Sequence, residues 1–156
     1  MQSLLSEQEY KLFKRAHSIA LSYLNRRNYC SYDLEQKLKI RIESPYIIKI
    51  VIEHLAENGI INDDDYAKTL SSNLIKYKFK GLLYIKSVLF KKRLDYVLKD
   101  YAFLQEIEEL EIINLEIYID KIKHRFNTDK LIRHLLSRGY EFNIIKPLID
   151  SKELAK

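Results

Sequence analysis

Few residues of this chain favour tight turns, since its 156 residues include three glycines and two prolines. β-Sandwiches and β-barrels need many tight connections, which these two residue types supply. Their scarcity therefore favours a fold of helices joined by short turns. A chain of this length can bury one shared core or form a few small helical modules.

Cysteine is also scarce, and long apolar runs are missing. Cys30 is the only cysteine, so an internal disulfide is excluded, and no Cys/His cluster has the spacing of a zinc site. No apolar run approaches the roughly 18 residues of a membrane span, and the first residues lack the pattern of an export signal. We expect a cytoplasmic protein without a membrane segment or a bound metal.

Motifs typical of enzymes are missing as well. The sequence has no Gly-rich phosphate loop, no nucleophile elbow and no HExxH, and its histidines fall on separate segments. Asp63, Asp64 and Asp65 could suggest a metal site, but they lack the alternating spacing of a calcium loop. Carboxylates satisfy free N–H groups at a helix start, so we interpret them as a cap. We expect no enzyme activity, no catalytic residues and no cofactor.

Hydrophobic periodicity predicts helices along the whole chain. The first helix should run up to about Arg27, and the second should start at a Ser31 cap. The third should extend from Ser44-Pro45 to Asn58-Gly59. The others are predicted over 66–78, from Gly81 through Leu89, over 96–104 and 108–123, from a Thr128 cap to Ser137, and over 142–149.

A spacing pattern recurs along the chain. An aromatic residue is followed by apolar residues five and nine positions later in Tyr29-Leu34-Leu38, Phe79-Tyr84-Val88 and Phe126-Leu131-Leu135. Such a period indicates tandem modules that bury their faces against their neighbours. We predict an all-α chain of three tandem three-helix, helix-turn-helix-like repeats in an elongated, curved array. The predicted repeats are 1–60 with a short N-terminal extension, the basic segment 61–106, and 107–156.

Charge is segregated, although the net charge is only +5. Between Asp65 and Asp95 there is no acidic residue, and the cations there are Lys68, Lys76, Lys78, Lys80, Lys86, Lys91, Lys92 and Arg93. From Asp95 to Asp120 the balance reverses, with Lys99 the only cation. The lysines could bind a polyanion or an acidic partner, or they could form a solvated face that pairs with the acidic block.

Aromatic and further basic residues adjoin these lysines. Tyr77, Phe79 and Tyr84 could stack on unpaired bases, or they could belong to the core. Basic groups also end the first helix of the other repeats, at Arg26-Arg27 and at Lys121, Lys123 and Arg125. They could line one side of the array, but cations are favoured at helix C-termini in any case.

Three motifs resemble those of the RecX family. Arg26-Arg27-Asn28-Tyr29-Cys30-Ser31 with Leu34-Glu35-Gln36-Lys37-Leu38 is similar to its first-module motif. The junction Asn58-Gly59-Ile60-Ile61-Asn62-Asp63-Asp64-Asp65-Tyr66-Ala67 and the stretch Leu135-Leu136-Ser137-Arg138-Gly139-Tyr140-Glu141-Phe142 resemble its later motifs. The chain departs from the family at two turns, with Ile42 and Arg93 where a Gly usually follows the second helix, so we expect these turns to differ.

The resemblance implies a regulator that lies along the RecA recombinase filament on single- or double-stranded DNA and restrains ATP hydrolysis and strand exchange. We expect a monomer without a cofactor. The expected contacts to DNA or recombinase are Arg26, Arg27, Lys76, Lys78, Lys80, Lys86, Lys91, Lys92, Arg93 and Arg138. Two alternatives remain: a helical DNA-binding regulator that acts without recombinase, and a repeat scaffold for an unrelated protein.

Overall fold

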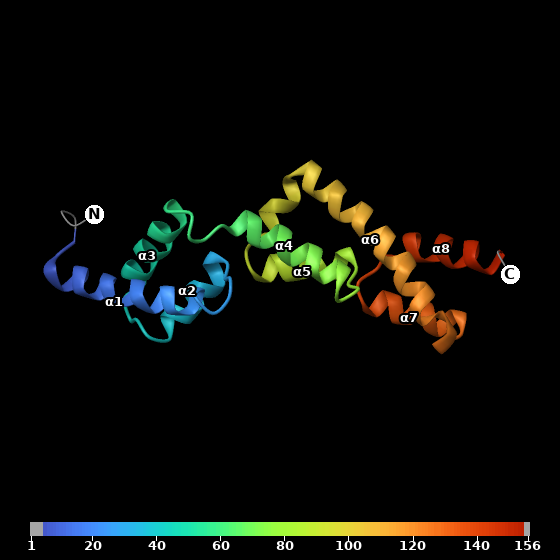
Figure 1. Cartoon of the computed structure of the whole chain (residues 1–156), viewed down its shortest axis with the longest axis horizontal. Helices are drawn as coiled ribbons and strands as arrows, with labels where there is room; N and C mark the ends of the chain where they lie inside the picture. The colour runs from blue at the N-terminus through green and yellow to red at the C-terminus, as the bar shows by residue number, and fades with distance from the viewer. Residues whose placement is uncertain (1–4, 155–156) are drawn as a thin grey trace. The chain divides into compact units, whose positions relative to one another are not determined.

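A computed structural model of the chain describes residues 5–154, with side chains through residue 151. All regular elements in this part are helical, which confirms the all-α prediction (Figure 1). They are α1 (Glu7–Leu24), α2 (Ser31–Lys39), α3 (Pro45–Glu57), α4 (Asp63–Lys76), α5 (Leu82–Lys91), α6 (Tyr101–Ile122), α7 (Thr128–Ser137) and α8 (Phe142–Leu154). Short 3₁₀ turns cover Asp95–Lys99 and Lys123–Arg125. None of the described helices combines the length and hydropathy needed to cross a bilayer.

The chain folds as two units, Met1–Tyr66 and Ala67–Lys156. The division into three repeats stays a prediction. Its second border, at 106/107, lies inside α6. In that proposed division the second and third repeats therefore share one helix.

The first unit packs α1, α2 and α3 around one apolar core. The buried core residues are Phe13, Ala16, Ala20, Leu34, Leu38, Ile42, Ile47, Ile48, Val51, Leu55 and Ile61. Ser6 begins α1 with a capping box, in which its N–H donates to Glu9 at 2.9 Å and its hydroxyl accepts from the Glu9 N–H at 3.3 Å.

Local signals in α3 behave as predicted. Ser44 accepts a hydrogen bond from the Ile47 N–H at 3.3 Å, and Pro45 is the first helical residue. Gly59 follows the helix at a φ of 68°, which a residue without Cβ adopts at little cost.

The predicted caps of α2 and α7 are displaced by one residue. Cys30 occupies the N-cap position of α2, so Ser31 is its first helical residue. Asn127 caps α7 by accepting from the Lys130 N–H at 2.9 Å, and Thr128 is the first helical residue. In both cases the extended backbone that a cap requires lies one position earlier in the chain.

The helices predicted over 96–104 and 108–123 are wrong. Residues 95–99 form a 3₁₀ turn, and α6 runs unbroken through the predicted gap. Asp100 starts α6 because its carboxylate accepts hydrogen bonds from the N–H groups of Ala102 at 3.0 Å and Phe103 at 3.3 Å. No Gly or Pro lies between this cap and Ile122 to end the helix.

The repeat register also needs a correction in the second segment. Ile85 and Leu89 are buried in α5, whereas Tyr84 is 37% exposed and Val88 is half-buried. The core positions therefore lie one residue later than the ungapped pattern predicts. An extra residue is accommodated in the turn before α5, where Phe79 adopts a φ of 47°.

The two unusual turns have different conformations. Arg93 has a φ of 58°, and the Leu94 N–H reaches back to the Leu89 carbonyl at 2.9 Å. Gly139 has a φ of 90°, and the N–H of the next residue, Tyr140, likewise donates to the Leu135 carbonyl at 3.3 Å. The expectation that the turn at Arg93 would differ is therefore wrong, because Arg93 takes the left-handed conformation despite its Cβ. Ile42 is instead buried, and its N–H donates to the Leu38 carbonyl at 2.9 Å.

Two helix N-termini are held by carboxylates from further along the chain. The N–H of Ser31, which begins α2, donates to Asp63 at 2.7 Å across 32 residues. The N–H of Leu82, which begins α5, donates to Glu111 at 2.7 Å across 29 residues. Asp63, interpreted from the sequence as a cap of its own helix, thus caps α2, while the Asn62 side chain accepts from the Asp65 N–H at 3.1 Å at the start of α4. The recurrence of this contact supports the proposed repeat.

Candidate nucleic-acid interface

The turn between α4 and α5 carries basic and aromatic side chains onto α6. The ring of Phe79 stacks on that of Tyr118, with centroids 4.6 Å apart and planes within 12°. The Lys121 ammonium lies 5.4 Å from the Phe79 ring centroid. We call Lys78, Phe79, Lys80, Tyr118, Lys121 and Arg138 the basic–aromatic cluster.

Arg138 fastens this turn to the end of α7. Its Nε donates to the Phe79 carbonyl at 2.8 Å, and its Nη2 donates to the carbonyl of Lys78. The guanidinium carbon lies 5.0 Å from the Tyr118 ring centroid. These contacts fix the left-handed backbone of Phe79 and the position of both lysines beside it. Arg138 is thus a positioning residue, and its predicted contact with a partner stays a prediction.

Glycines allow the same turn to approach α7 closely. A Cβ on Gly81 would lie 2.2 Å from the backbone carbonyl of Gly139, so only glycine fits there. The Gly81 N–H donates to the Arg138 carbonyl at 3.0 Å, and the Leu83 N–H donates to the Gly139 carbonyl at 3.1 Å. This backbone contact, with the side chain of Arg138, places the cluster on a rigid support.

Positive charge dominates the electrostatics of the cluster. Burial lowers the pKa of His134, and the charges of Arg138 and Lys80 lower it further. The imidazole is therefore neutral at pH 7, and its Nε2 lies 2.9 Å from the Tyr118 hydroxyl. Lys80 also lies over the Tyr84 ring, 4.3 Å from its centroid. Cations held beside aromatic faces suit phosphates and bases.

The aromatic side chains are not core residues. Tyr77 is 72% exposed and Tyr84 is 37% exposed. Phe79 is half-buried because one face of its ring packs on Tyr118. The sequence left open whether these rings are exposed or belong to the core. Tyr77 and Tyr84 are exposed, while Phe79 packs within the basic–aromatic cluster.

The predicted contact residues fall into three groups. Lys76, Lys78 and Lys80 lie at the end of α4 and join Arg138 in or beside the cluster. A second group, Lys91, Lys92 and Arg93, lies at the end of α5. Lys86 is half-buried within α5; burial raises the pKa of the nearby Glu111 carboxyl, and the charge of Lys86 opposes this rise in part. That these residues contact DNA or recombinase stays a prediction.

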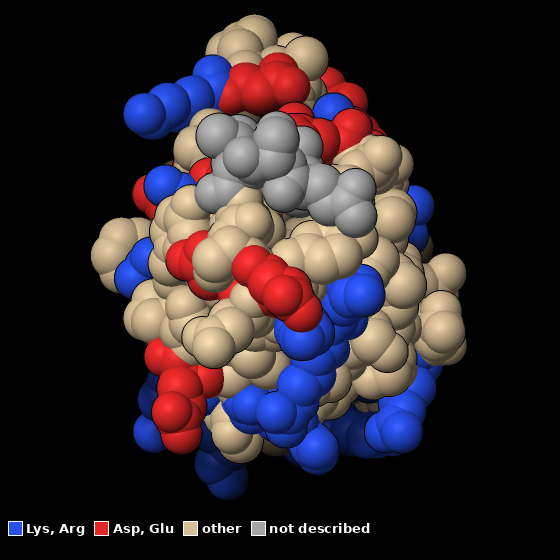
Figure 2. Space-filling model, turned by 90° about the vertical axis from the view of Figure 1, so that its left-hand side faces the viewer, with Lys and Arg blue, Asp and Glu red and all other residues tan. Residues whose placement is uncertain are grey.

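Arg26 and Arg27 lie in the first unit, where both are exposed after α1. The guanidinium carbon of Arg27 lies 4.4 Å from the Tyr29 ring centroid. Figure 2 shows that Lys and Arg side chains gather in the lower half of one face.

Sequence reasoning missed Tyr118. It lies in the acidic segment, and nothing in its local pattern shows that Phe79 will stack on it. Lys121 follows it by three residues, a spacing that places both side chains on one helix face, and this was the available signal.

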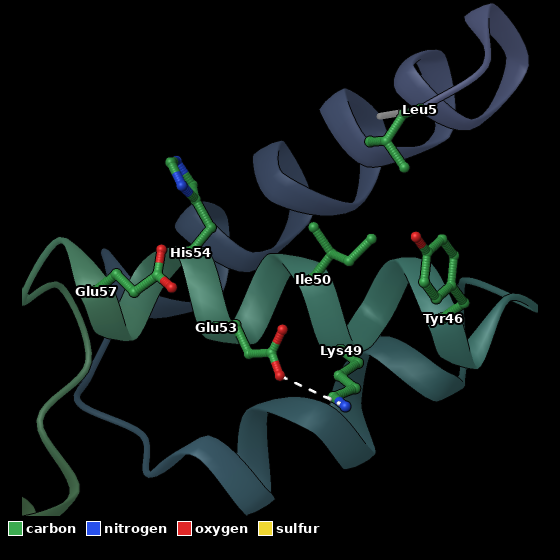
Figure 3. A pocket seen from close by; sticks show the side chains of 7 residues that line it. All are labelled: Leu5, Tyr46, Lys49, Ile50, Glu53, His54 and Glu57. Atoms are coloured by element: carbon green, nitrogen blue, oxygen red, sulfur yellow. Dashed lines mark ion pairs between the residues drawn. The ribbon is translucent and has the colours of Figure 1, made fainter. Parts of the chain in front are cut away.

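A groove in the first unit offers a less suitable site. It has a volume of about 350 Å³ and lies on α3, with Leu5 reaching toward it from the chain before α1 (Figure 3). Its charged residues are mixed, and the Lys49 ammonium lies 3.7 Å from the Glu53 carboxylate. The His54 ring lies 3.2 Å from the side-chain amide of Asn58, the residue that follows α3. In the described part of the chain, no three potential ligand side chains converge to hold a metal.

The chain is similar in sequence to curated proteins named Regulatory protein RecX. It is 28% identical to that of Staphylococcus carnosus over 144 residues, which cover 88% of this chain and 54% of that protein. It is 26% identical to that of Lactococcus lactis over 157 residues, which cover 94% of this chain and 58% of that protein. The chain therefore spans little more than half the length of these relatives. No protein-family model matches it.

Solved RecX structures share the fold. The crystal structure of RecX from Lactobacillus salivarius matches with a TM-score of 0.80 and 24% identity, over 93% of this chain and 99% of that one. A second crystal structure of regulatory protein RecX matches with a TM-score of 0.76 and 20% identity, over 94% of this chain and 80% of that one. The sequence similarity along nearly the whole chain and the common fold together place this protein in the RecX family of regulatory proteins.

Proposed function

We propose that this chain binds the RecA recombinase filament on DNA and restrains its ATP hydrolysis and strand exchange. It acts as a monomer in the cytoplasm, by binding alone and without chemistry of its own. The observation that carries the proposal is membership of the RecX family, whose members named here are regulators.

The basic–aromatic cluster supports the DNA part of this proposal. Lys78 and Lys121 are exposed; Lys78 directly precedes Phe79 in the chain, and the Lys121 ammonium lies 5.4 Å from the Phe79 ring centroid. Their ammonium groups suit the phosphates of a nucleic-acid backbone, and Tyr77 beside them offers a ring for an unpaired base. These side chains would recognise backbone phosphates and unpaired bases of any sequence, so we expect binding without sequence preference.

The end of α5 supplies a second cationic group for the same filament. Lys91 and Arg93 are exposed there. The left-handed turn at Arg93 directs the chain away from the helix, as Gly139 does after α7. We assign this group to phosphates or to an acidic recombinase surface.

Binding to labelled single-stranded DNA, bare or coated with the cognate recombinase, tests the proposal at one fixed salt concentration. We expect tighter binding to the coated DNA. The double variant Lys78→Glu/Lys121→Glu should weaken it at least tenfold. The matched control Lys11→Glu/Lys49→Glu makes the same charge change on exposed residues of the first unit and should have a smaller effect.

Two outcomes would contradict the proposal. One is equal affinity for bare and coated DNA, which means that the recombinase contributes nothing. The other is sequence-specific binding to one duplex without recombinase, which favours a helical DNA-binding regulator.

A further inference from the structure

One face of α6 exposes large apolar side chains that the fold does not use. Ile113 is 57% exposed and follows the half-buried Leu110 by three residues, and Ile117 is 53% exposed and follows Ile113 by four. Such spacing places the three side chains on one face of the helix. We call Leu110, Ile113 and Ile117 the apolar strip.

The opposite side of α6 forms the core. Ile107, Leu115 and Ile119 are each at most 2% exposed, and Leu115 and Ile119 pack with α7 and α8. The helix is therefore fully anchored without the strip. A single exposed isoleucine is ordinary on a protein surface, but neighbouring ones on one helix face form a patch of the kind that binds partners.

Carboxylates border the apolar strip along its whole length. Glu106, Glu109, Glu116 and Asp120 are exposed and lie on the same helix face at spacings of three, four and seven. The Lys123 ammonium pairs with Asp120 at 2.9 Å, and the Gln105 side chain donates a hydrogen bond to Glu109 at 3.0 Å.

This combination excludes one class of partner and fits another. Four carboxylates repel the phosphates of a nucleic acid. Apolar side chains bordered by carboxylates are complementary to a protein segment whose apolar residues are flanked by Lys or Arg.

We propose that the apolar strip and its carboxylates form a docking surface for such a basic, apolar segment of the recombinase. This inference rests on the proposed function. It assigns adjacent faces of α6 to different parts of one nucleoprotein filament. Tyr118 belongs to the cluster that meets DNA, while Ile113 and Ile117 meet protein. Lys121 follows Ile117 by four residues and therefore lies where these two faces meet. Successive residues such as Ile117 and Tyr118 point about 100° apart on a helix, so one helix can present both faces.

A photocrosslinker tests the assignment directly. We would replace Ile113 with p-benzoylphenylalanine in the full chain, add recombinase-coated single-stranded DNA, irradiate, and identify the crosslinked species. Sedimentation of the chain with the coated DNA is measured in the same sample. Crosslinking to recombinase supports the proposal. Sedimentation with crosslinking to DNA alone, to a second copy of this chain alone, or to nothing overturns it. Failure to sediment overturns the proposed function as well.

Serine variants give an independent readout. Ile113→Ser/Ile117→Ser should weaken binding to coated DNA about tenfold and leave binding to bare DNA unchanged. Ile112→Ser is the matched control, since Ile112 is 46% exposed but lies one position off the strip. Its effect should be less than twofold. An equal effect of both changes, or an unchanged affinity of the double variant with normal helicity, contradicts docking at the strip.

Discussion

The backbone N–H of Leu82 donates a 2.7 Å hydrogen bond to the buried carboxylate of Glu111. This contact joins the start of α5 to the middle of α6. Burial raises the pKa of Glu111, and the bond from Leu82 opposes that shift only in part. The carboxylate is therefore needed as an acceptor but costs free energy when it is ionised.

Replacing Glu111 separates these two effects. Glu111→Gln keeps a carbonyl acceptor for Leu82 and removes the ionisation, so stability at pH 7 should be equal or higher. Glu111→Ala leaves a buried N–H without an acceptor and should cost about 1–3 kcal/mol. Urea unfolding measures both. Equal destabilisation by both variants would contradict the assigned role.

The pH dependence of unfolding gives the sign of the Glu111 effect. A raised folded-state pKa means that the native state binds its proton more tightly than the unfolded state. The stabilising contribution of the protonated Glu111 carboxyl is full below its pKa in the unfolded chain, and it is lost as the pH rises through its pKa in the folded chain. The Glu111→Gln variant should lack this loss between pH 4 and 7, and a loss as large as that of the wild-type chain would refute the shift.

Gly81→Ala should disrupt the support of the basic–aromatic cluster. The added Cβ would overlap the Gly139 backbone, so we expect destabilisation of about 3 kcal/mol. Gly59→Ala is the control, because it introduces strain at a φ of +68° but meets no atom within 4 Å. It should cost about 1 kcal/mol. The two thermal unfolding midpoints should differ clearly, and equal midpoints would argue against the close approach.

Local sequence signals predicted much of this fold. Ser44, Pro45 and Gly139 act on their own backbones, so their roles can be read without tertiary information. Asp100 gave a similar signal but was overlooked as the cap of α6. The contact between Phe79 and Tyr118 was out of reach, because it depends on a left-handed turn that no glycine marks.

The candidate site was predicted in composition but not in geometry. Charge segregation located Lys78 and Lys80 in the basic segment. Arg138 was predicted as a partner contact, whereas its guanidinium binds two backbone carbonyls of this same chain. Such long-range bonds depend on how α7 packs, which periodicity within one helix does not encode.

His17 should make the first unit sensitive to acid. Burial lowers its pKa, and the neighbouring His54, with its ring centroid 5.5 Å away, lowers it further. The unfolded chain therefore takes up a proton first, at pH values near 6.5. Stability is full above this pH and falls as pH drops through the folded pKa.

His17→Gln removes this titration and should flatten the decline between pH 7 and pH 5. Urea midpoints at several pH values, followed by NMR of residues in α1, measure it. A decline that is unchanged in the variant would assign the acid sensitivity to other groups.

Charge reversal at the end of α5 tests the second cationic group. Lys91→Glu/Lys92→Glu/Arg93→Glu should weaken inhibition of the recombinase at least tenfold while circular dichroism shows unchanged helicity. Arg93→Gly serves as a conformational control, because glycine adopts the φ of 58° without the Cβ penalty of about 1 kcal/mol. It should retain stability and lose only part of the inhibition. Full inhibition by the triple variant removes this group from the interface.

The most direct test of the central proposal is the rate of ATP hydrolysis by the cognate recombinase on single-stranded DNA. The chain is titrated in at fixed salt, from far below to above one molecule per recombinase. We predict inhibition well below this ratio, because a filament regulator acts on many recombinase subunits at once. Undiminished hydrolysis at stoichiometric excess would contradict regulation of the filament.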